Sequence, residues 1–171
     1  MPLDKGPAKD CLLIYIGELE QRRQATVHIL TKLREYVGDH RDPSVFRNLL
    51  TVPGVGFKTA LVLYTEIIDM RRFPTLDHVK SFAGLVPSTD SSGDSDRARG
   101  LTYRSNKRLK HVLIESAWVA IRQDPVLLQK YNKLIARMKS QDAIIKIAVK
   151  LLDRIRYVWN NNCPYVKGVI Q

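Results

Sequence analysis

Apolar residues recur at steps of three and four along most of this chain, and no other feature constrains its fold as strongly. An α-helix turns once in about 3.6 residues, so this spacing places the apolar side chains on one face of a helix. The longest stripe lies near the C-terminus and consists of Ile144, Ile147, Ala148, Leu151, Leu152, Ile155 and Val158. A second stripe consists of Leu109, Val112, Leu113, Ser116, Ala117 and Ala120. The sequence therefore predicts an all-α fold.

Proline, glycine and capping residues divide the chain into separate helices. Asp42-Pro43 and Asp124-Pro125 each place a capping carboxylate before a proline at the first helical position. Thr75 and Ser140 are further candidate caps, and Gly84 is a candidate helix end. We expect breaks at 38–43 and 69–74, and helices over about 10–37, 43–51, 57–68, 75–84, 109–120, 125–138 and 140–158.

The N-terminal helix predicted from Asp10 to Val37 has an interrupted apolar seam. The seam consists of Leu12, Ile16, Leu19, Leu30, Leu33 and Val37, and Arg23 and Thr26 interrupt its middle. Such a seam fits a short coiled coil or an arm docked on a partner, and it fits equally well a helix packed on its own domain. We expect residues 1–41 to form a lead-in and connector helix that mediates self-association, and residues 42–171 to form a second domain.

The segment from Leu85 to Tyr103 differs in kind from the rest of the chain. It is rich in Ser, Asp, Gly and Arg and has almost no apolar period. A long loop or a short hairpin is therefore expected there. Loops of this length are uncommon inside compact domains and are often functional.

The charge balance points to a nucleic-acid partner. The chain has 28 Lys and Arg against 17 Asp and Glu, a formal net charge of +11. A surplus of this size favours the phosphate backbone or an anionic membrane surface as the partner. No apolar run is long enough to span a bilayer, and the N-terminus lacks the apolar stretch of a signal peptide. We therefore expect a cytoplasmic protein that binds nucleic acid and no membrane.

Neither a metal site nor a disulfide is expected in this chain. Cys11 and Cys163 lie far apart in the sequence, and neither has a His or Cys at the spacing of metal ligands. The four histidines are scattered. Asp90, Asp94 and Asp96 cluster in the Ser-rich segment, but a flexible loop lacks the rigid carboxylate framework that two-metal chemistry needs.

The segment Val52-Pro53-Gly54-Val55-Gly56 lies between two predicted helices and resembles the turn of a helix-hairpin-helix module. Gly54 and Gly56 allow a tight turn and would expose backbone N–H groups at the start of the second helix. Those amides and the helix dipole would form a phosphate site that does not depend on base sequence, with Lys58 adding a charge. The alternative is a Gly-rich turn that binds no ligand.

A basic segment follows the Ser-rich loop. It consists of Arg97, Arg99, Arg104, Lys107, Arg108 and Lys110, with no acidic residue among them. Most charge runs are simply solvated helix faces. Six cations beside a loop of functional character favour a phosphate track instead.

The hydroxyl groups of the loop are the candidate nucleophiles: Ser88, Thr89, Ser91, Ser92 and Ser95. The loop contains no His and the chain has no Gly-x-Ser-x-Gly motif, so acyl transfer has no support. Phosphoryl transfer depends mainly on positioning and on cationic stabilisation of the phosphate. From these residues alone, a polar loop without chemistry is the simpler interpretation.

The order of motifs resembles a known family. The matching segments are Pro53-Gly54-Val55-Gly56, Phe82-Ala83-Gly84-Leu85-Val86-Pro87, Ser92-Gly93, Arg104-Ser105-Asn106-Lys107-Arg108-Leu109, Ala117-Trp118 and Asp124-Pro125. Together they resemble the C-terminal domain of the insertion-sequence one-ten transposases, over roughly residues 49–164. The block from Phe82 to Pro87 followed by Ser-Gly is specific, whereas the glycine turn alone is not.

The resemblance implies a function and a nucleophile. In that family a serine within Pro-x-x-x-x-Ser-Gly attacks DNA, which implies that Ser92 is the catalytic residue, with Ser91 one position away. It also implies a guide RNA from the element, a connector that ends in the 10–37 helix, and an N-terminal RuvC-like domain whose acidic residues hold Mg²⁺.

Two departures qualify that expectation. This chain shows no counterpart of the RuvC-like domain, so we expect it to bind no cofactor itself and to be inactive alone. The family often has Gly-Asn where this chain has Ser105-Asn106. The alternative function is a non-enzymatic helix-hairpin-helix module that binds DNA.

Overall fold

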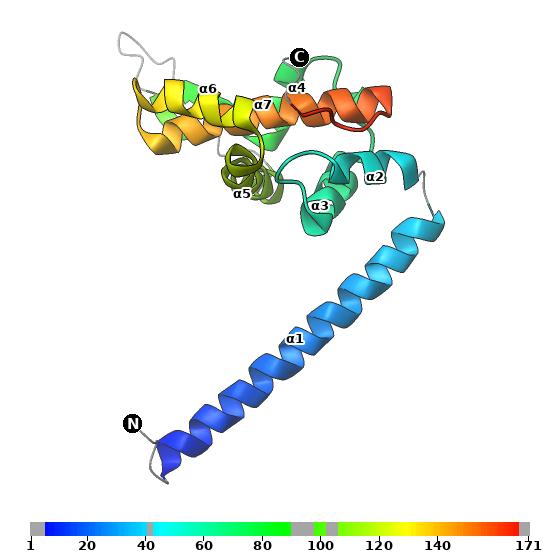
Figure 1. The fold of residues 1–171 in the computed structure, drawn as a ribbon, viewed down its shortest axis with the longest axis vertical. Helices are drawn as coiled ribbons and strands as arrows, with labels where there is room; N and C mark the ends of the chain where they lie inside the picture. The colour runs from blue at the N-terminus through cyan, green and yellow to red at the C-terminus, as the bar shows by residue number, and fades with distance from the viewer. Residues whose placement is uncertain (1–5, 41–42, 90–97, 102–105, 168–171) are drawn as a thin grey trace. The chain divides into compact units, whose positions relative to one another are not determined.

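The computed structural model describes residues 6–40, 43–89, 98–101 and 106–167 of the chain. These residues form two compact units, Met1–Pro43 and Ser44–Gln171, which are described separately below. The described residues are almost entirely helical, as Figure 1 shows, which confirms the predicted all-α class.

The first unit consists of one long helix, α1 (Pro7–His40). Its 34 residues correspond to a length of about 50 Å at about 1.5 Å per residue. Leu12, Ile16 and Leu19 of the predicted seam are exposed. The break predicted from Gly38 is wrong, because the helix continues to His40. A single glycine costs a helix about 1 kcal/mol and does not by itself end it.

The second unit carries the remaining elements. They are α2 (Pro43–Leu50), α3 (Phe57–Ile67), the 3₁₀ helix η1 (Met70–Arg72), α4 (Leu76–Ala83), the strands β1 (Pro87–Thr89) and β2 (Ala98–Leu101), α5 (Lys107–Gln123), α6 (Pro125–Ile135) and α7 (Ser140–Asn161). The two strands pair antiparallel, with Pro87 opposite Leu101 and Thr89 opposite Ala98. The Ser-rich segment therefore contains a short hairpin, which was one of the two structures expected from the sequence.

Helices α5 and α7 form the centre of the core. Helix α5 contacts α3, α4, α6 and α7, and α7 also contacts η1. The predicted stripe of α7 is buried along its whole length, from Ile144 to Val158. Burial of each large apolar side chain contributes about 1.5–3 kcal/mol to stability. The apolar period therefore identified the principal packing face correctly.

A chain of aromatic contacts packs the α2–α3 pair against the end of α7. The ring of Phe46 in α2 meets those of Phe57 and Tyr64 in α3 edge-on, at centroid distances of 5.5 and 5.9 Å. The Tyr64 ring stacks on Trp159 of α7 at 5.7 Å. These contacts hold the α2–α3 turn against the rest of the domain.

The predicted helix ends fall into three groups. Asp124 caps α6 as expected, accepting a hydrogen bond of 2.8 Å from the Val126 amide, and Gly84 ends α4 with a left-handed φ of 69°. Thr75 precedes α4, but its hydroxyl lies 2.6 Å from Nδ1 of His78 and caps no backbone amide. The prediction for Ser140 is wrong, because it is the first residue of α7 and Lys139 holds the capping position.

Two further boundaries differ from the prediction. Helix α6 ends at Ile135, three residues earlier than expected. The break expected at 69–74 contains the short helix η1, which Asp69 caps by accepting a hydrogen bond from the Arg71 amide. Helix ends fray and their last turn is often a 3₁₀ turn, so the apolar period does not fix the terminal residues.

Candidate nucleic-acid interface

The α2–α3 turn packs tightly against α5. Gly54 has a φ of +79°, which side-chain-bearing residues rarely adopt, and a methyl group at this position would lie 2.1 Å from the carbonyl oxygen of Ser116. Val52 and Val55 on either side are buried. Gly54 is therefore required both by the backbone conformation of the turn and by its close approach to α5.

The Gly54 amide is already used within the protein. Its N–H donates a hydrogen bond of 2.9 Å to Oε1 of Gln123, at the end of α5. In this structure the Gly54 amide therefore contacts Gln123, and its role toward a phosphate stays a prediction. The sequence offered no sign of this bond, because the two residues lie far apart in the chain.

Gly56 has a different role from Gly54. It is the N-cap of α3, with an ordinary extended conformation (φ −87°, ψ 177°) and open space around it. A glycine cap has no side chain to accept from the first-turn amides, and the first helical bond runs from the Ala60 amide to the Gly56 carbonyl. The first-turn amides at Lys58 and Thr59 precede that bond, so the helix itself provides no acceptor for them. Gly56 therefore leaves these amides of α3 without a side-chain cap.

A shallow depression lies at this turn. It is lined by residues 50–56, Val119, Gln123 and Lys167. Lys167 was not among the predicted site residues, and it brings a cation from the C-terminal tail to the turn. Lys58 is exposed on the first turn of α3, outside the lining residues.

The C-terminal tail is bonded to the core through Tyr165. Its backbone N–H donates to the Thr51 hydroxyl at 2.7 Å, next to the turn. Its own hydroxyl donates to Oδ2 of Asp124 and accepts from Nη1 of Arg154 at 2.6 Å. Arg154 Nη1 also donates to Asp124 Oδ2 at 2.8 Å. These bonds fix the backbone two residues before Lys167.

The Tyr165 network has perturbed acid–base properties. Burial, together with the hydrogen bond to Asp124, raises the pKa of Tyr165 to about 12. Burial also acts to raise the pKa of Asp124, but the hydrogen bonds from Tyr165 and the Val126 amide, with the charge of Arg154, outweigh it. The pKa of Asp124 is therefore lowered. Asp124 and Arg154 form a buried ion pair, at 1% and 4% exposure.

The start of α5 is held by Asn106. Its side-chain oxygen accepts from the Leu109 amide at 3.0 Å, and its side-chain nitrogen donates to Oε2 of Glu66 at 2.6 Å. Its backbone N–H donates to the Phe82 carbonyl of α4 at 3.1 Å. The end of α4 and the start of α5, which flank the Ser-rich segment in sequence, are therefore joined beside α3.

The predicted basic residues of α5 lie at this same end. Lys107 and Arg108 are exposed and Lys110 is half-buried. Glu66 of α3 approaches the cluster, with its Oε1 3.8 Å from Nη1 of Arg108. The sequence showed no acidic residue within the segment and could not show one that comes from another helix.

The structure separates the two predicted binding elements. Gly54 packs at Ser116, ten residues along α5 from Asn106, which corresponds to about 15 Å. Lys58 and the α5 cations therefore occupy opposite ends of the α3–α5 pair. Ser92, Ser91, Arg97 and Arg104 lie outside the described residues. Arg99 belongs to β2, and its side chain is also outside the description.

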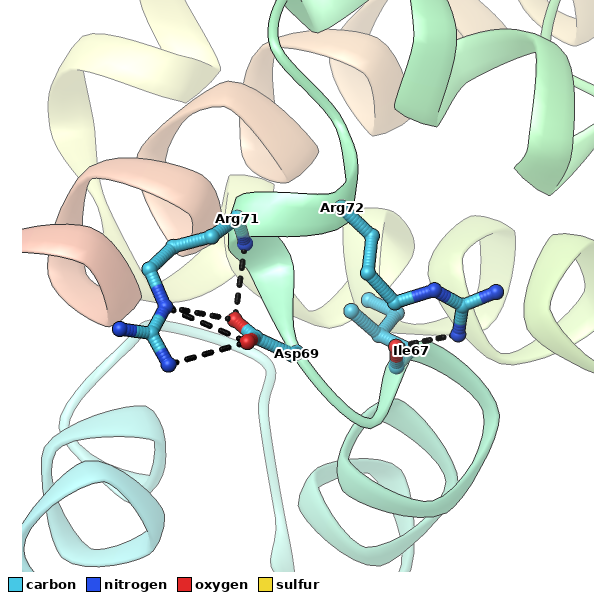
Figure 2. A network of polar contacts seen from close by, with 4 residues as sticks. All are labelled: Ile67, Asp69, Arg71 and Arg72. Atoms are coloured by element: carbon cyan, nitrogen blue, oxygen red, sulfur yellow. Dashed lines mark hydrogen bonds and ion pairs between the residues drawn. The ribbon is translucent and has the colours of Figure 1, made fainter.

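A further polar network closes the C-terminal end of α3. Ile68 has φ 64° and ψ −57°, and the Asp69 amide donates to the Ile67 carbonyl at 2.7 Å, which defines a γ-turn. Figure 2 shows the surrounding contacts: Asp69 accepts from Arg71, and Nη1 of Arg72 donates to the Ile67 carbonyl at 3.2 Å. The hydrogen bonds and charge of Arg71 lower the pKa of Asp69.

None of the helices in the described ranges is long and apolar enough to cross a membrane. Within the same ranges, no three His, Cys, Asp or Glu side chains gather in a way that could hold a metal ion. Cys11 and Cys163 are free thiols.

Comparison with known proteins identifies the class of protein, because residues 46–132 match a family model of transposases. The chain belongs to the Transposase IS116/IS110/IS902 family. It is 37% identical over 101 residues to a protein of insertion element IS110 from Streptomyces coelicolor, covering 58% of this chain and 25% of that protein. It is 33% identical over 156 residues to y4rJ of Sinorhizobium fredii, named as a transposase, covering 86% of this chain and 39% of that protein.

A third relative is named for DNA inversion. The pilin gene-inverting protein of Moraxella bovis is 30% identical over 124 residues, covering 71% of this chain and 38% of that protein. The chain thus spans between a quarter and two fifths of the length of these three relatives.

Proposed function

We propose that residues 44–171 form the DNA-binding and serine-nucleophile domain of an insertion-sequence transposase. The observation that carries the binding part is the depression at the α2–α3 turn, which is lined both by a tail cation, Lys167, and by Gly56, the N-cap of α3. In this proposal α2 and α3 act as a helix-hairpin-helix module that binds a phosphate group without reading base sequence. Membership in a transposase family supports DNA as the partner.

The turn would bind phosphate through three components. Gly54 keeps the backbone close to α5 and so shapes the depression. The first-turn amides of α3, at Lys58 and Thr59, have no acceptor within the helix and lie at the positive end of the helix dipole. Lys167 and Lys58 add two positive charges. Such a site favours any phosphodiester, because amides and ammonium groups contact no base.

The α5 cations would make a second contact with the same duplex. They lie about 15 Å from the turn along α5. Successive phosphates of one strand advance by about 3.4 Å along the duplex axis, so this separation spans roughly four base steps. The DNA backbone would then be contacted by the cations of α5 and of the preceding segment: Lys107, Arg108, Lys110, Arg97, Arg99 and Arg104.

The binding proposal is tested by the salt dependence of DNA affinity. Fluorescence anisotropy with a labelled duplex should show an affinity that falls steeply as salt rises, because cations on the duplex are released. Lys167→Ala should reduce the slope of log affinity against log salt by about 0.9, the contribution of one phosphate contact. Arg23→Gln, which removes one charge from α1, is the matched control and should leave the slope unchanged. A flat salt dependence of the parent would contradict the proposal.

The catalytic part of the proposal concerns Ser92. Its hydroxyl oxygen would attack a DNA phosphorus atom, so that an Oγ–P bond forms and one P–O bond of the DNA backbone breaks. The hydroxyl proton is released, and the departing sugar oxygen takes up a proton. Arg97 and Arg99 would stabilise the charge on the phosphate. Membership in the transposase family supports this part, and the bonds of Asn106 hold the start of α5, which follows the Ser-rich segment in sequence.

The Mg²⁺ expected from the family resemblance does not fit the described residues, because no three His, Cys, Asp or Glu side chains among them lie close enough together to hold a metal ion. In this proposal a separate RuvC-like domain supplies the carboxylates that hold it. The chain alone should therefore bind DNA without cleaving it. With a RuvC-like domain supplied, a covalent protein–DNA adduct should form.

The adduct provides the test of the nucleophile. Ser92→Ala should abolish it, whereas Ser91→Ala and Ser88→Ala should retain it. Peptide mass mapping should place the adduct on Ser92. An adduct on Ser91 would move the role by one residue, and an adduct outside residues 88–95 would refute the mechanism. No adduct at all, with DNA binding intact, would favour a non-enzymatic DNA-binding module.

Two partners complete the proposal. A structured RNA from the element is expected from the family resemblance, and its binding to the full chain can be measured by the same anisotropy method. Self-association through α1 is supported by the exposed side chains of Leu12, Ile16 and Leu19.

A further inference from the structure

A basic groove lies between α6 and α7, and none of the residues that line it is assigned to DNA binding in the proposed function. The two helices run side by side in Figure 1 and contact each other. The groove is lined by Val126, Leu127, Gln129, Lys130 and Lys133 of α6 and by Lys150 and Arg154 of α7. Cations from both helices therefore face one groove.

The charge of this groove is only partly compensated. Arg154 is paired with Asp124 at 2.8 Å, and Lys150 with Asp153 at 3.2 Å. Helix α6 contains no acidic residue, and within the described ranges Lys130 and Lys133 are exposed and form no ion pair. They lie one turn apart on the same side of α6. Two positive charges thus remain at the groove.

The buried end of the groove holds an unsatisfied donor. Nη1 of Arg154 is used twice, by Asp124 and by Tyr165, but its Nε is buried and has no acceptor. A buried donor without an acceptor is destabilising. An anion seated in the groove would lie beside the guanidinium that carries this donor.

The lining residues also indicate the kind of anion. None of them is aromatic, so the groove offers no surface on which a base could stack. Its apolar part comes from Val126 and Leu127, and its polar part is made of ammonium, guanidinium and amide groups. These groups contact phosphate oxygens and do not distinguish one base from another.

We propose that the α6–α7 groove binds the phosphodiester backbone of a nucleic acid, as a second site separate from the α2–α3 turn. The inference rests on the proposed function in one respect only, that nucleic acid is a partner of this domain. With two sites, one domain can hold two segments of nucleic acid at once.

The first test uses the full chain and a double variant, Lys130→Gln with Lys133→Gln. Anisotropy with a labelled duplex should give a salt slope smaller by about two than that of the parent, and an affinity about tenfold weaker at moderate salt. Arg22→Gln with Arg23→Gln, which removes the same charge from α1, is the control and should match the parent. Thermal unfolding by circular dichroism should show that both variants keep their fold, since all four side chains are exposed.

The second test observes Arg154 directly. In the ¹⁵N-labelled chain, the side-chain Nε–H resonance of Arg154 should shift when duplex DNA is added and should shift less in the double variant. Inorganic phosphate at the same phosphate concentration should shift it little. An equal shift with inorganic phosphate would identify a site for free phosphate and overturn the phosphodiester assignment.

The outcomes separate this inference from the proposed function. If the groove variant binds DNA as the parent does while Lys167→Ala weakens binding, the groove inference falls and the proposed function stands. If the parent binds no nucleic acid, the proposed function fails and the groove inference fails with it. A reduced slope together with a shifted Arg154 resonance supports both.

Discussion

The side-chain amide of Asn106 donates a hydrogen bond of 2.6 Å to Oε2 of Glu66, and this bond joins the start of α5 to α3. The same residue caps α5 with its side-chain oxygen and bonds α4 through its backbone N–H. One asparagine therefore connects three helices at the point where the Ser-rich segment returns to the core.

Replacement of Asn106 by alanine should lower the free energy of unfolding by about 2 kcal/mol. Loss of the cap accounts for about 1 kcal/mol and loss of the bond to Glu66 for a similar amount. Urea unfolding measures the change. The exposed neighbour His111→Ala should change stability by less than about 0.5 kcal/mol. Equal stability of Asn106→Ala and the parent would show that the three-helix connection is unimportant.

The two glycines of the α2–α3 turn should respond differently to substitution. Gly54→Ala should destabilise the domain by about 3 kcal/mol, because the new methyl group meets the Ser116 carbonyl at 2.1 Å and the φ of +79° disfavours a side chain. Gly56→Ser should be neutral or slightly stabilising, because open space surrounds Gly56 and a serine can cap α3. Chemical unfolding compares the two. A stable Gly54→Ala variant would contradict the close packing.

Stability at alkaline pH should depend on Tyr165. Its pKa is raised to about 12, above the ordinary tyrosine value of about 10. The stabilisation is therefore complete below pH 10 and is lost as pH rises through the folded-state pKa. Tyr165→Phe should be less stable by about 1–2 kcal/mol at neutral pH. It should also lose stability less steeply between about pH 10 and 12 than the parent, which unfolding at a series of pH values would show. Parallel pH profiles would indicate that the hydroxyl is not coupled to Asp124.

Ile68 should be better replaced by glycine. A β-branched residue with a positive φ is strained by about 1–3 kcal/mol, and Ile68 is 55% exposed, so little packing is lost. Ile68→Gly should raise the free energy of unfolding by about 1 kcal/mol. Ile68→Val keeps the branched Cβ and serves as the control without gain. A less stable glycine variant would argue that the Ile68 side chain contributes packing.

Self-association should depend on the exposed apolar residues of α1. Leu12→Glu with Leu19→Glu should shift the full chain toward monomer in sedimentation velocity, because charges replace apolar surface that a second helix would cover. Arg23→Glu, at the interruption of the seam, should leave the association unchanged. Monomeric behaviour of the parent would refute the role of α1.

The fold was predictable from the sequence to the extent that it depends on apolar periodicity. The buried stripes of α5 and α7 follow directly from their spacing, and Asp124-Pro125 correctly marked the start of α6. Helix ends were less predictable. Gly38 did not stop α1, because a single glycine costs a helix only about 1 kcal/mol. Ser140 did not cap α7, because it is already the first residue of that helix.

The candidate site was less predictable because it depends on contacts between distant segments. The sequence could not show that Gln123 takes the Gly54 amide, nor that Tyr165 brings Lys167 to the turn. One signal was present but unused. Arg154 lies within the apolar stripe of α7, between Leu151 and Val158, and a cation at such a position indicates a buried partner.

The number of residues in helix α1 determines how its two ends are rotated relative to each other. Because it is one uninterrupted helix, deletion of a single residue within it would turn one part against the other by about 100° and shorten it by about 1.5 Å. Deletion of seven residues would restore the direction of the apolar stripe to within about 20°. Insertions and deletions of seven residues therefore keep the direction of the apolar stripe, whereas other lengths rotate it. The length of α1 thus sets both the distance and the rotation between the two ends of the helix.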